Sequence, residues 1–373
     1  MKRNLIILIL IAVMSLVAGS IIYYAAGLGN GEAIKLSGKI NVVADSGNYG
    51  AVNHAAAVFK ELHPRIEIEV TEESDVYAGV SSDLKTGSLK EDVFVVPEKN
   101  VMPLLKSSEG HFMDLTQYVN GVGESYPKGV LAGLTYNKSI YGIPWTTKPM
   151  VVLYRKDLFS VNGVDVSEIK TWDDFRKTGI GLSGKTGKKF LIYNADQFEQ
   201  LRSILLSQLR IKYSDQENYT RATELINGMV ADKTLQSTSS LVSTLKQGKA
   251  LAAIVSPSDA INIMNETSSL QGKWGAMELP AFEPGGNRDV TLGGYSLMIN
   301  KNTRNSDLAK EFGKYLSSDG ALATSNLNQY GIFSAAYTIY GGDGFSFPSG
   351  YFGMDIWSLF AKVAADAPQN VYQ

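Results

Sequence analysis

The stretch from residue 39 to residue 96 restricts the fold more than any other part of the chain, because two kinds of apolar periodicity alternate along it. Strands are predicted at Lys39–Ala44, Ile66–Val70 and Asp92–Val96, where apolar residues run together or alternate. Helical spacing occupies the stretches between them, at residues 55–62 and 76–86. Strands that alternate with helices in this way pair in parallel through right-handed crossovers, so an α/β fold is predicted.

Two turn-rich stretches, Asp45–Gly50 and Pro97–Asn100, follow predicted strands. Open α/β sheets bind their ligands beyond the carboxyl ends of the strands. Both stretches are therefore expected to form loops that contact a ligand.

A second pattern of strands and helices covers the rest of the chain. Thr171 and Asp174 have the spacing of a helix N-cap and its acidic partner. The predicted strands lie at residues 149–154, 190–193, 250–255 and 297–299, and the predicted helices start at residue 171 and cover 197–209, 220–230, 239–247 and 308–316. A length of 373 residues suits about two domains.

The N-terminus has the character of an export segment. Lys2 and Arg3 precede an apolar run that extends to residue 28, long enough to span a bilayer. Residues 16–20 resemble a lipoprotein processing box, but Ser20 stands where that box requires cysteine, so lipidation there is excluded. We predict an anchor over residues 1–28 and a tether over 29–38, with a cleaved signal peptide as the alternative. Either way, the later residues are expected outside the cytoplasm.

Composition excludes several classes of site. The chain has no cysteine, which rules out disulfides, thiolate metal sites and a cysteine nucleophile. His54, His63 and His111 lie in different segments without metal-ligand spacing, so no metal or cofactor is expected. The 35 basic and 37 acidic residues argue against nucleic-acid binding. Three sequons, at Asn137, Asn218 and Asn265, could accept a glycan if the source cell glycosylates.

Motifs of catalysis are also missing. The sequence holds neither a G-x-S-x-G elbow nor a P-loop, and the glycine-rich stretch Gly179–Lys185 lacks phosphate-loop spacing and is interpreted as a flexible loop. Asp173 and Asp174 are interpreted as a helix first turn, where negative charge is favoured. We therefore expect a protein that is not an enzyme. An exported glycan-processing enzyme stays open as the alternative.

Five segments, taken in order, resemble family 1 extracellular solute-binding proteins of ABC importers, the group that includes the maltose-binding protein. They are Tyr141–Trp145 with Leu153–Phe159, Thr171–Phe175, Gln247–Ile254, Gly293–Asn300 with Leu308–Phe312, and Asn328–Phe333. The resemblance covers about residues 38 to 373.

This resemblance implies a periplasmic-binding-protein fold, in which two α/β lobes enclose a ligand cleft and close about hinge crossovers. Lobe 1 would comprise residues 39–146 and 296–335, and lobe 2 residues 150–292 and 336–373. The crossings would fall near Trp145–Met150 and Leu292–Tyr295. The expected ligand is a mono- or oligosaccharide, the expected partner an ABC permease, and the expected state a monomer. The same fold binding a non-sugar solute, such as iron, is a further alternative.

The resemblance also implies where ligand contacts lie, since aromatic rings stack on sugar faces and polar side chains meet sugar hydroxyls. The candidate ligand-binding residues are Asn48, Tyr49, Glu98, Trp145, Lys148, Asp196, Phe198, Asp259, Gly294, Tyr295, Phe352 and Asp355. Two of them depart from the family pattern. Lys148 stands where the maltose-binding protein has a carboxylate contact. In Ser256–Asp259 the stacking tryptophan of the family is missing, and Asp259 is expected to supply a hydrogen bond instead.

Overall fold

The computed structural model describes residues 36–368 except 88, 122, 210–214, 342–344 and 346–349. The strands are β1 Gly38–Ala44, β2 Ile66–Glu72, β3 Val93–Pro97, β4 Thr135–Tyr136, β5 Ser139–Ile140, β6 Ile143–Pro144, β7 Val151–Arg155, β8 Lys189–Asn194, β9 Leu235–Thr238, β10 Ala250–Val255, β11 Trp274–Met277 and β12 Tyr295–Ile299.

The α-helices are α2 Ser46–Leu62, α3 Val76–Thr86, α4 Glu98–Ser108, α5 Thr116–Asn120, α6 Lys128–Gly133, α7 Lys156–Val161, α8 Trp172–Thr186, α9 Phe198–Leu209, α10 Asp215–Ala231, α11 Leu241–Lys246, α12 Pro257–Glu266, α13 Ser306–Ser318, α14 Gly320–Tyr330 and α15 Ile356–Asp366. Short 3₁₀ turns are η1 Glu109–His111, η2 Gly123–Ser125, η3 Val166–Glu168, η4 Ala195–Gln197, η5 Ser268–Leu270 and η6 Tyr337–Gly341.

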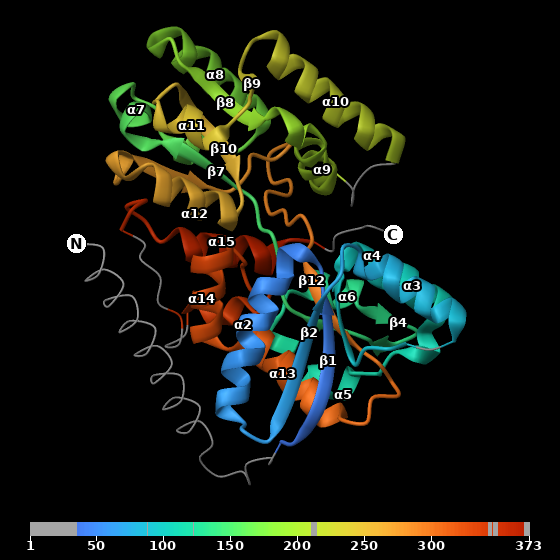
Figure 1. Cartoon of the computed structure of the whole chain (residues 1–373). Coiled ribbons are helices and arrows are strands. Elements are labelled where there is room, and N and C mark those ends of the chain that lie inside the picture. The colour runs from blue at the N-terminus through green and yellow to red at the C-terminus, as the bar shows by residue number, and fades with distance from the viewer. Residues whose placement is uncertain are drawn as a thin grey trace, which may run out of the picture.

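The first sheet has the order β2-β1-β3-β12-β6 and forms the core of one body of the molecule (Figure 1). Strand β1 pairs in parallel with both β2 and β3, which confirms the pairing expected from the alternating pattern. Strand β12 returns from far along the sequence and pairs antiparallel with β3 and β6. Helices α2 and α13 pack together beside the sheet, and α3 packs with α4 (Figure 1).

The second sheet has the order β11-β7-β10-β8-β9 and forms the core of the other body (Figure 1). Strands β10, β8 and β9 are parallel, whereas β7 lies antiparallel to β10 and β11. The inner strand β10 is entirely apolar because helices cover both faces of this sheet, as the two separate groups of buried neighbours indicate. The molecule is thus an α/β protein with two lobes.

Helix starts replace both predicted loops beyond the strands of the first sheet, so the prediction of loops there was wrong. Asp45 caps α2, since its carboxylate accepts hydrogen bonds from the amide of Asn48 at 3.0 Å and from its side chain at 2.8 Å. Helix α4 begins directly after β3, and the Glu98 N–H donates to the Gly294 carbonyl at 2.9 Å. The residues remain at the carboxyl ends of the strands, where ligands bind.

The predicted capping box of α8 is confirmed, because Thr171 and Asp174 exchange hydrogen bonds. This helix also contains the glycine-rich stretch Gly179–Lys185, so its interpretation as a flexible loop was wrong. A Cβ at Gly179 would lie 2.3 Å from the Phe190 ring. The glycine therefore lets α8 approach β8 closely, which is a packing role.

Three segments join the lobes, one more than predicted. The first crossing, Trp145–Met150, lies between the second, near residues 292–295, and the third, around residues 331–335. On one side, the Leu292 N–H donates to the Lys148 carbonyl at 2.9 Å, and the Trp145 N–H donates to the Tyr295 carbonyl at 3.0 Å. On the other side, the Thr147 N–H donates to the Phe333 carbonyl at 3.0 Å, and the Ala335 N–H donates to the Trp145 carbonyl at 2.9 Å. The segment around residues 331–335 is the unpredicted crossing.

Residues near the third crossing pack with both lobes, so the structure does not fix the predicted lobe boundaries there. These boundaries remain a prediction. Leu327 and Phe333, assigned to lobe 1, pack in the apolar group that surrounds β10, α12 and α15. Ala336 and Ile339, assigned to lobe 2, pack with Tyr126 of lobe 1. The chain between α14 and α15 therefore belongs to both bodies.

The predicted anchor over residues 1–28 and most of the predicted tether lie outside the described residues. Within the described residues no helix is long and apolar enough to cross a membrane. Among the sequons, Asn137 and Asn265 are exposed, whereas Asn218 is only 2% exposed inside α10. The fold encloses the Asn218 side chain, so this sequon is not accessible to a glycan in the folded protein.

Candidate functional site

A cavity of about 500 Å³ lies where the two lobes and all three crossing segments meet. Its walls come from the start of α2, the β3–α4 junction, the start of α12 and the end of α14. The lining residues are Asn48, Pro97, Glu98, Lys99, Thr146, Thr147, Lys148, Pro257, Ser258, Leu292, Gly293, Gly294, Tyr295, Tyr330, Gly331, Ile332 and Phe333. A volume of this size is typical of small-molecule sites.

The lobe 1 wall is a hydrogen-bonded group of three side chains. Asn48 is 5% exposed, and its side chain donates a hydrogen bond to the Asp45 carboxylate. The same carboxylate also accepts a hydrogen bond from the Tyr295 hydroxyl. Burial, with the hydrogen bond and negative charge of Asp45 adding to it, raises the pKa of Tyr295 to about 12. Tyr295 therefore keeps its proton at neutral pH, and the three side chains hold one another in place.

The floor of the cavity is the backbone of the crossing segments. The Tyr295 N–H donates to the Thr146 hydroxyl at 2.9 Å. A Cβ at Gly294 would lie 1.8 Å from the Thr146 carbonyl oxygen, so only glycine allows this approach. Thr147 is 5% exposed, and its hydroxyl oxygen is buried without a hydrogen-bond partner among the described residues. Buried polar groups normally have hydrogen-bond partners, so this hydroxyl is a candidate contact for a bound solute.

Lobe 2 and α14 supply the remaining wall. Pro257 and Ser258 stand in the first turn of α12, and Tyr330 is the last residue of α14, 38% exposed. A Cβ at Gly50 would lie 3.0 Å from the Tyr330 ring, so the missing side chain at residue 50 makes room for it. Gly331, with φ of +65°, ends α14 and directs the chain past Ser258 into the third crossing.

The structure brings together five of the candidate residues in this lining: Asn48, Glu98, Lys148, Gly294 and Tyr295. Sequence reasoning missed Thr147, Ser258, Tyr330 and Phe333 as lining residues. Tyr330 and Phe333 lie within the Asn328–Phe333 segment that carried part of the resemblance. The third crossing, on which they depend, was not predicted.

Four candidates have structural roles instead, so their assignment to the ligand site is corrected. Trp145 and Phe352 are 1% and 0% exposed and belong to apolar cores. Asp259 accepts from the amide of Ser256 at 2.9 Å and from its hydroxyl at 2.6 Å, completing the capping box of α12. Asp355 caps α15. The carboxylates of Asp259 and Asp355 thus accept hydrogen bonds from donors at the start of a helix.

Tyr49, Asp196 and Phe198 do not reach the cavity lining. Tyr49 is half-buried in the first turn of α2. Asp196 is exposed in η4, and Phe198 packs against the ring of Tyr193 at 6.0 Å between centroids.

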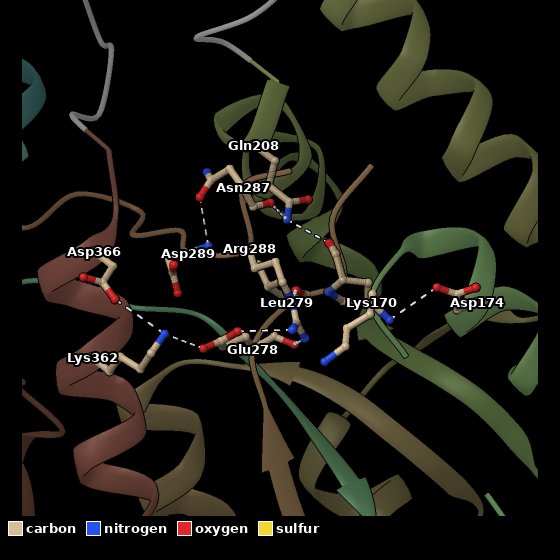
Figure 2. Close-up of polar contacts among 11 residues, drawn as sticks. Lys170, Asp174, Gln208, Glu278, Leu279, Asn287, Arg288, Asp289, Lys362 and Asp366 are labelled. Atoms are coloured by element: carbon tan, nitrogen blue, oxygen red, sulfur yellow. Dashed lines mark hydrogen bonds and ion pairs between the residues drawn. The ribbon is translucent and has the colours of Figure 1, made fainter. Parts of the chain in front are cut away.

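The second crossing is secured in lobe 2 by a polar network over residues 278–289 (Figure 2). Gln208 donates to the carbonyls of Pro280 at 2.9 Å and Asn287 at 3.0 Å. Arg288 donates to the Leu279 carbonyl at 2.8 Å. Glu278 pairs with Arg288 at 3.3 Å and with Lys362 of α15 at 2.5 Å (Figure 2).

Asp289 lies beside this network, and one oxygen of its carboxylate is buried without a hydrogen-bond partner among the described residues. Burial raises the pKa of Asp289 to about 6; Lys362 opposes this rise, and Glu278 adds to it. An acid with a raised pKa is most favourable to the folded state when protonated. Its contribution to stability is therefore lost as the pH rises from about 4 through about 6.

We expect Asp289→Asn to stabilise the protein at pH 7.5 by about 1–2 kcal/mol, after discounting for the partial solvent exposure of the carboxylate. At pH 4 the two proteins should differ little, because the carboxylate is then protonated. Urea unfolding at several pH values measures both. The control is Asp366→Asn, since Asp366 pairs with the same Lys362 but is exposed. Equal pH dependence in wild type and Asp289→Asn would contradict the prediction.

Comparisons with known proteins agree with this architecture. The arabinooligosaccharide-binding protein of Bacillus subtilis strain 168 is 23% identical over 301 residues, covering 72% of this chain and 69% of that protein. The sugar-binding protein MalE from Xanthomonas citri superposes with a TM-score of 0.73 at 18% identity, over 90% of this chain and 87% of that one. The GacH receptor of Streptomyces glaucescens superposes with a TM-score of 0.66 at 19% identity, over 89% of this chain and 87% of that one. The expected periplasmic-binding-protein fold is confirmed.

The family model of the bacterial extracellular solute-binding proteins matches residues 44–323, which is 280 of the 373 residues. The matched range includes the second sheet, the first sheet apart from most of β1, and two of the three crossing segments. The chain therefore belongs to the bacterial extracellular solute-binding protein family.

Proposed function

We propose that this protein is the extracytoplasmic sugar-binding subunit of an ABC importer, which captures a mono- or oligosaccharide between its lobes and delivers it to a permease. The observation that carries the proposal is the composition of the interlobe cavity. It combines an accessible tyrosine ring, Tyr330, with buried polar groups from lobe 1 and from the crossings and with the partly buried Ser258 of lobe 2. The relative in Bacillus subtilis, named for arabinooligosaccharides, supports the same class of ligand.

Each part of the cavity has a role in this proposal. The Tyr330 ring offers an apolar surface to the C–H face of a sugar ring. Asn48 and Ser258 offer hydrogen-bonding groups from opposite lobes, so one sugar can bridge them. Such bridging favours the closed form, because the ligand then gains contacts that the open form lacks. The crossing segments are where the chain would bend on closure.

We propose further that binding is not followed by catalysis, since the relatives are named as binding proteins. Delivery then depends on recognition of the closed form by the permease. Incubation with glycosides that match any ligand found should leave them intact, as measured by chromatography. Turnover at a rate that scales with protein concentration would favour the alternative of an exported glycan-processing enzyme.

A thermal-shift screen tests the ligand class. Arabino-, malto- and galacto-oligosaccharides should be compared with amino acids, peptides and iron salts. A true ligand at 100 times its Kd stabilises the folded protein by about 2.7 kcal/mol. Stabilisation by an amino acid, peptide or iron, with none by any saccharide, would overturn the proposed sugar binding and leave the family assignment intact.

Tyr330→Ala should weaken binding of the best saccharide about tenfold, which corresponds to roughly 1.4 kcal/mol, because the ring covers the apolar face of the sugar. The melting temperature without ligand should change little, since the ring is partly exposed. Titration calorimetry measures the affinity. The matched control is Tyr219→Ala, an exposed tyrosine on α10 that does not line the cavity. Unchanged affinity in Tyr330→Ala would remove this ring from the site.

A further inference from the structure

Two lysines line the cavity, and neither makes an ion pair within the part of the chain that the structure describes. Lys148 is half-buried in the first crossing, and Lys99 is exposed in the first turn of α4. Glu98 is the one acidic side chain among the described lining residues. Among the lining residues the two lysines therefore outnumber the single carboxylate, and the carboxylate of Asp45 in the lobe 1 wall already accepts hydrogen bonds from Asn48 and Tyr295.

Lys148 follows Thr147 in the chain, and both residues line the cavity. Thr147 is 5% exposed, and its hydroxyl oxygen has no hydrogen-bond partner among the described residues. The backbone of both residues is held in place: the Thr147 N–H donates to the Phe333 carbonyl at 3.0 Å, and the Lys148 carbonyl accepts from Leu292 at 2.9 Å. Hydrogen bonds to the other two crossings thus hold the backbone that carries the ammonium and the hydroxyl groups.

Closure of the lobes would remove water from these donors. An ammonium group that loses water is costly unless an opposite charge replaces it. A neutral sugar offers hydroxyl dipoles only, whereas an anionic oxygen would match both the charge of Lys148 and the donor of Thr147. Glu98 lies on the lobe 1 wall and can accept from sugar hydroxyls at the other parts of the ligand.

We propose that the solute is an acidic saccharide, whose carboxylate or phosphate group binds between the Lys148 ammonium and the Thr147 hydroxyl. This inference rests on the proposed sugar-binding function and specifies the class of sugar. Lys99, an exposed residue of the lining, contributes long-range attraction to the same charge, and salt screens this attraction.

Titration calorimetry with matched ligands tests the proposal. Disaccharides of one linkage should be compared in a neutral form and in a form that carries a uronic acid, together with sugar phosphates and with glucuronate and inorganic phosphate alone. We expect an acidic saccharide to bind at least tenfold more tightly than its neutral counterpart, and this preference should fall with added salt. Preference for the uronate or for the phosphate identifies which anion the site accepts.

Two variants locate the charge recognition. Lys148→Gln should lower the affinity for the acidic saccharide at least tenfold and change that for the neutral one less than threefold. Thr147→Val, which keeps the side-chain shape, should lower the affinity for the acidic saccharide about fivefold. The control is Lys301→Gln, an exposed lysine outside the cavity, which should leave both affinities unchanged. Circular dichroism and the melting temperature without ligand verify that each variant folds.

Equal affinities for the neutral and acidic saccharides, or an equal loss of both in Lys148→Gln, would overturn the proposed charge selectivity while leaving sugar binding in place. If no saccharide of either kind binds, but an amino acid or peptide does, the proposed sugar-binding function fails instead.

Discussion

Gly294→Ala is expected to destabilise the protein by about 3 kcal/mol or more and to weaken ligand binding at least tenfold. The added Cβ would lie 1.8 Å from the Thr146 carbonyl oxygen and 2.5 Å from its carbonyl carbon. Both atoms belong to the backbone, so no side chain can rotate away to relieve the contact. Overpacking typically costs about 1–3 kcal/mol when side chains can adjust, and this site has less freedom than that.

The loss of affinity follows from where the strain would be released. To make room, the first and second crossings must separate, and they carry Thr147, Lys148 and Tyr295 of the cavity. Urea unfolding and titration calorimetry measure the two effects. Gly133→Ala is the matched control, because a Cβ there meets nothing within 4 Å at the end of α6. Wild-type stability in Gly294→Ala would show that the crossings are not packed as described.

The second large effect concerns Trp145, which the resemblance placed at the ligand. Trp145→Ala should lower the free energy of unfolding by about 3–5 kcal/mol, the usual cost of removing a large buried aromatic side chain. The indole is 1% exposed among the apolar residues that surround the first sheet, with Ile143 and Leu297 in the same core. Its truncation leaves a cavity that the rigid sheet cannot fill.

Trp145→Phe separates the core role from a ligand role. Phenylalanine keeps most of the apolar volume, so the loss of stability should be smaller, about 1–2 kcal/mol. Affinity for the ligand should stay within twofold of wild type, because Trp145 does not line the cavity. A variant of normal stability that no longer binds ligand would return Trp145 to the binding site and refute the core assignment.

Much of the fold could be predicted from local pattern. The strands β1, β2, β8 and β10 and the helix α3 were expected within one or two residues, because their apolar periodicity reflects which side is buried. Helix starts with a capping residue could also be predicted from the sequence, as Thr171 at the start of α8 illustrates. The antiparallel placement of β7, β11 and β12 was not expected, since pairing of strands distant in sequence leaves no local signature.

The candidate site was predicted only in part, and the errors have one physical origin. An acidic or aromatic residue next to a strand end has the same sequence appearance whether it faces a ligand or serves the fold. Asp259 and Asp355 satisfy helix donors, and Trp145 and Phe352 fill cores. Tyr330 shows the opposite case, because a ring at the end of α14 gains significance only where the third crossing passes α12.

The sequence by itself determined the α/β class, the solute-binding family and the two crossings at Trp145–Met150 and Leu292–Tyr295, because these depend on local periodicity and on motifs in a preserved order. The tertiary structure alone decided which polar groups meet in the cavity. Asn48, Thr147 and Tyr330 are far apart along the chain, and burial leaves Thr147 without a described partner while Asp45 holds Asn48 and Tyr295 together. Hydrogen-bond satisfaction is a property of the assembled fold, and no segment carries it alone.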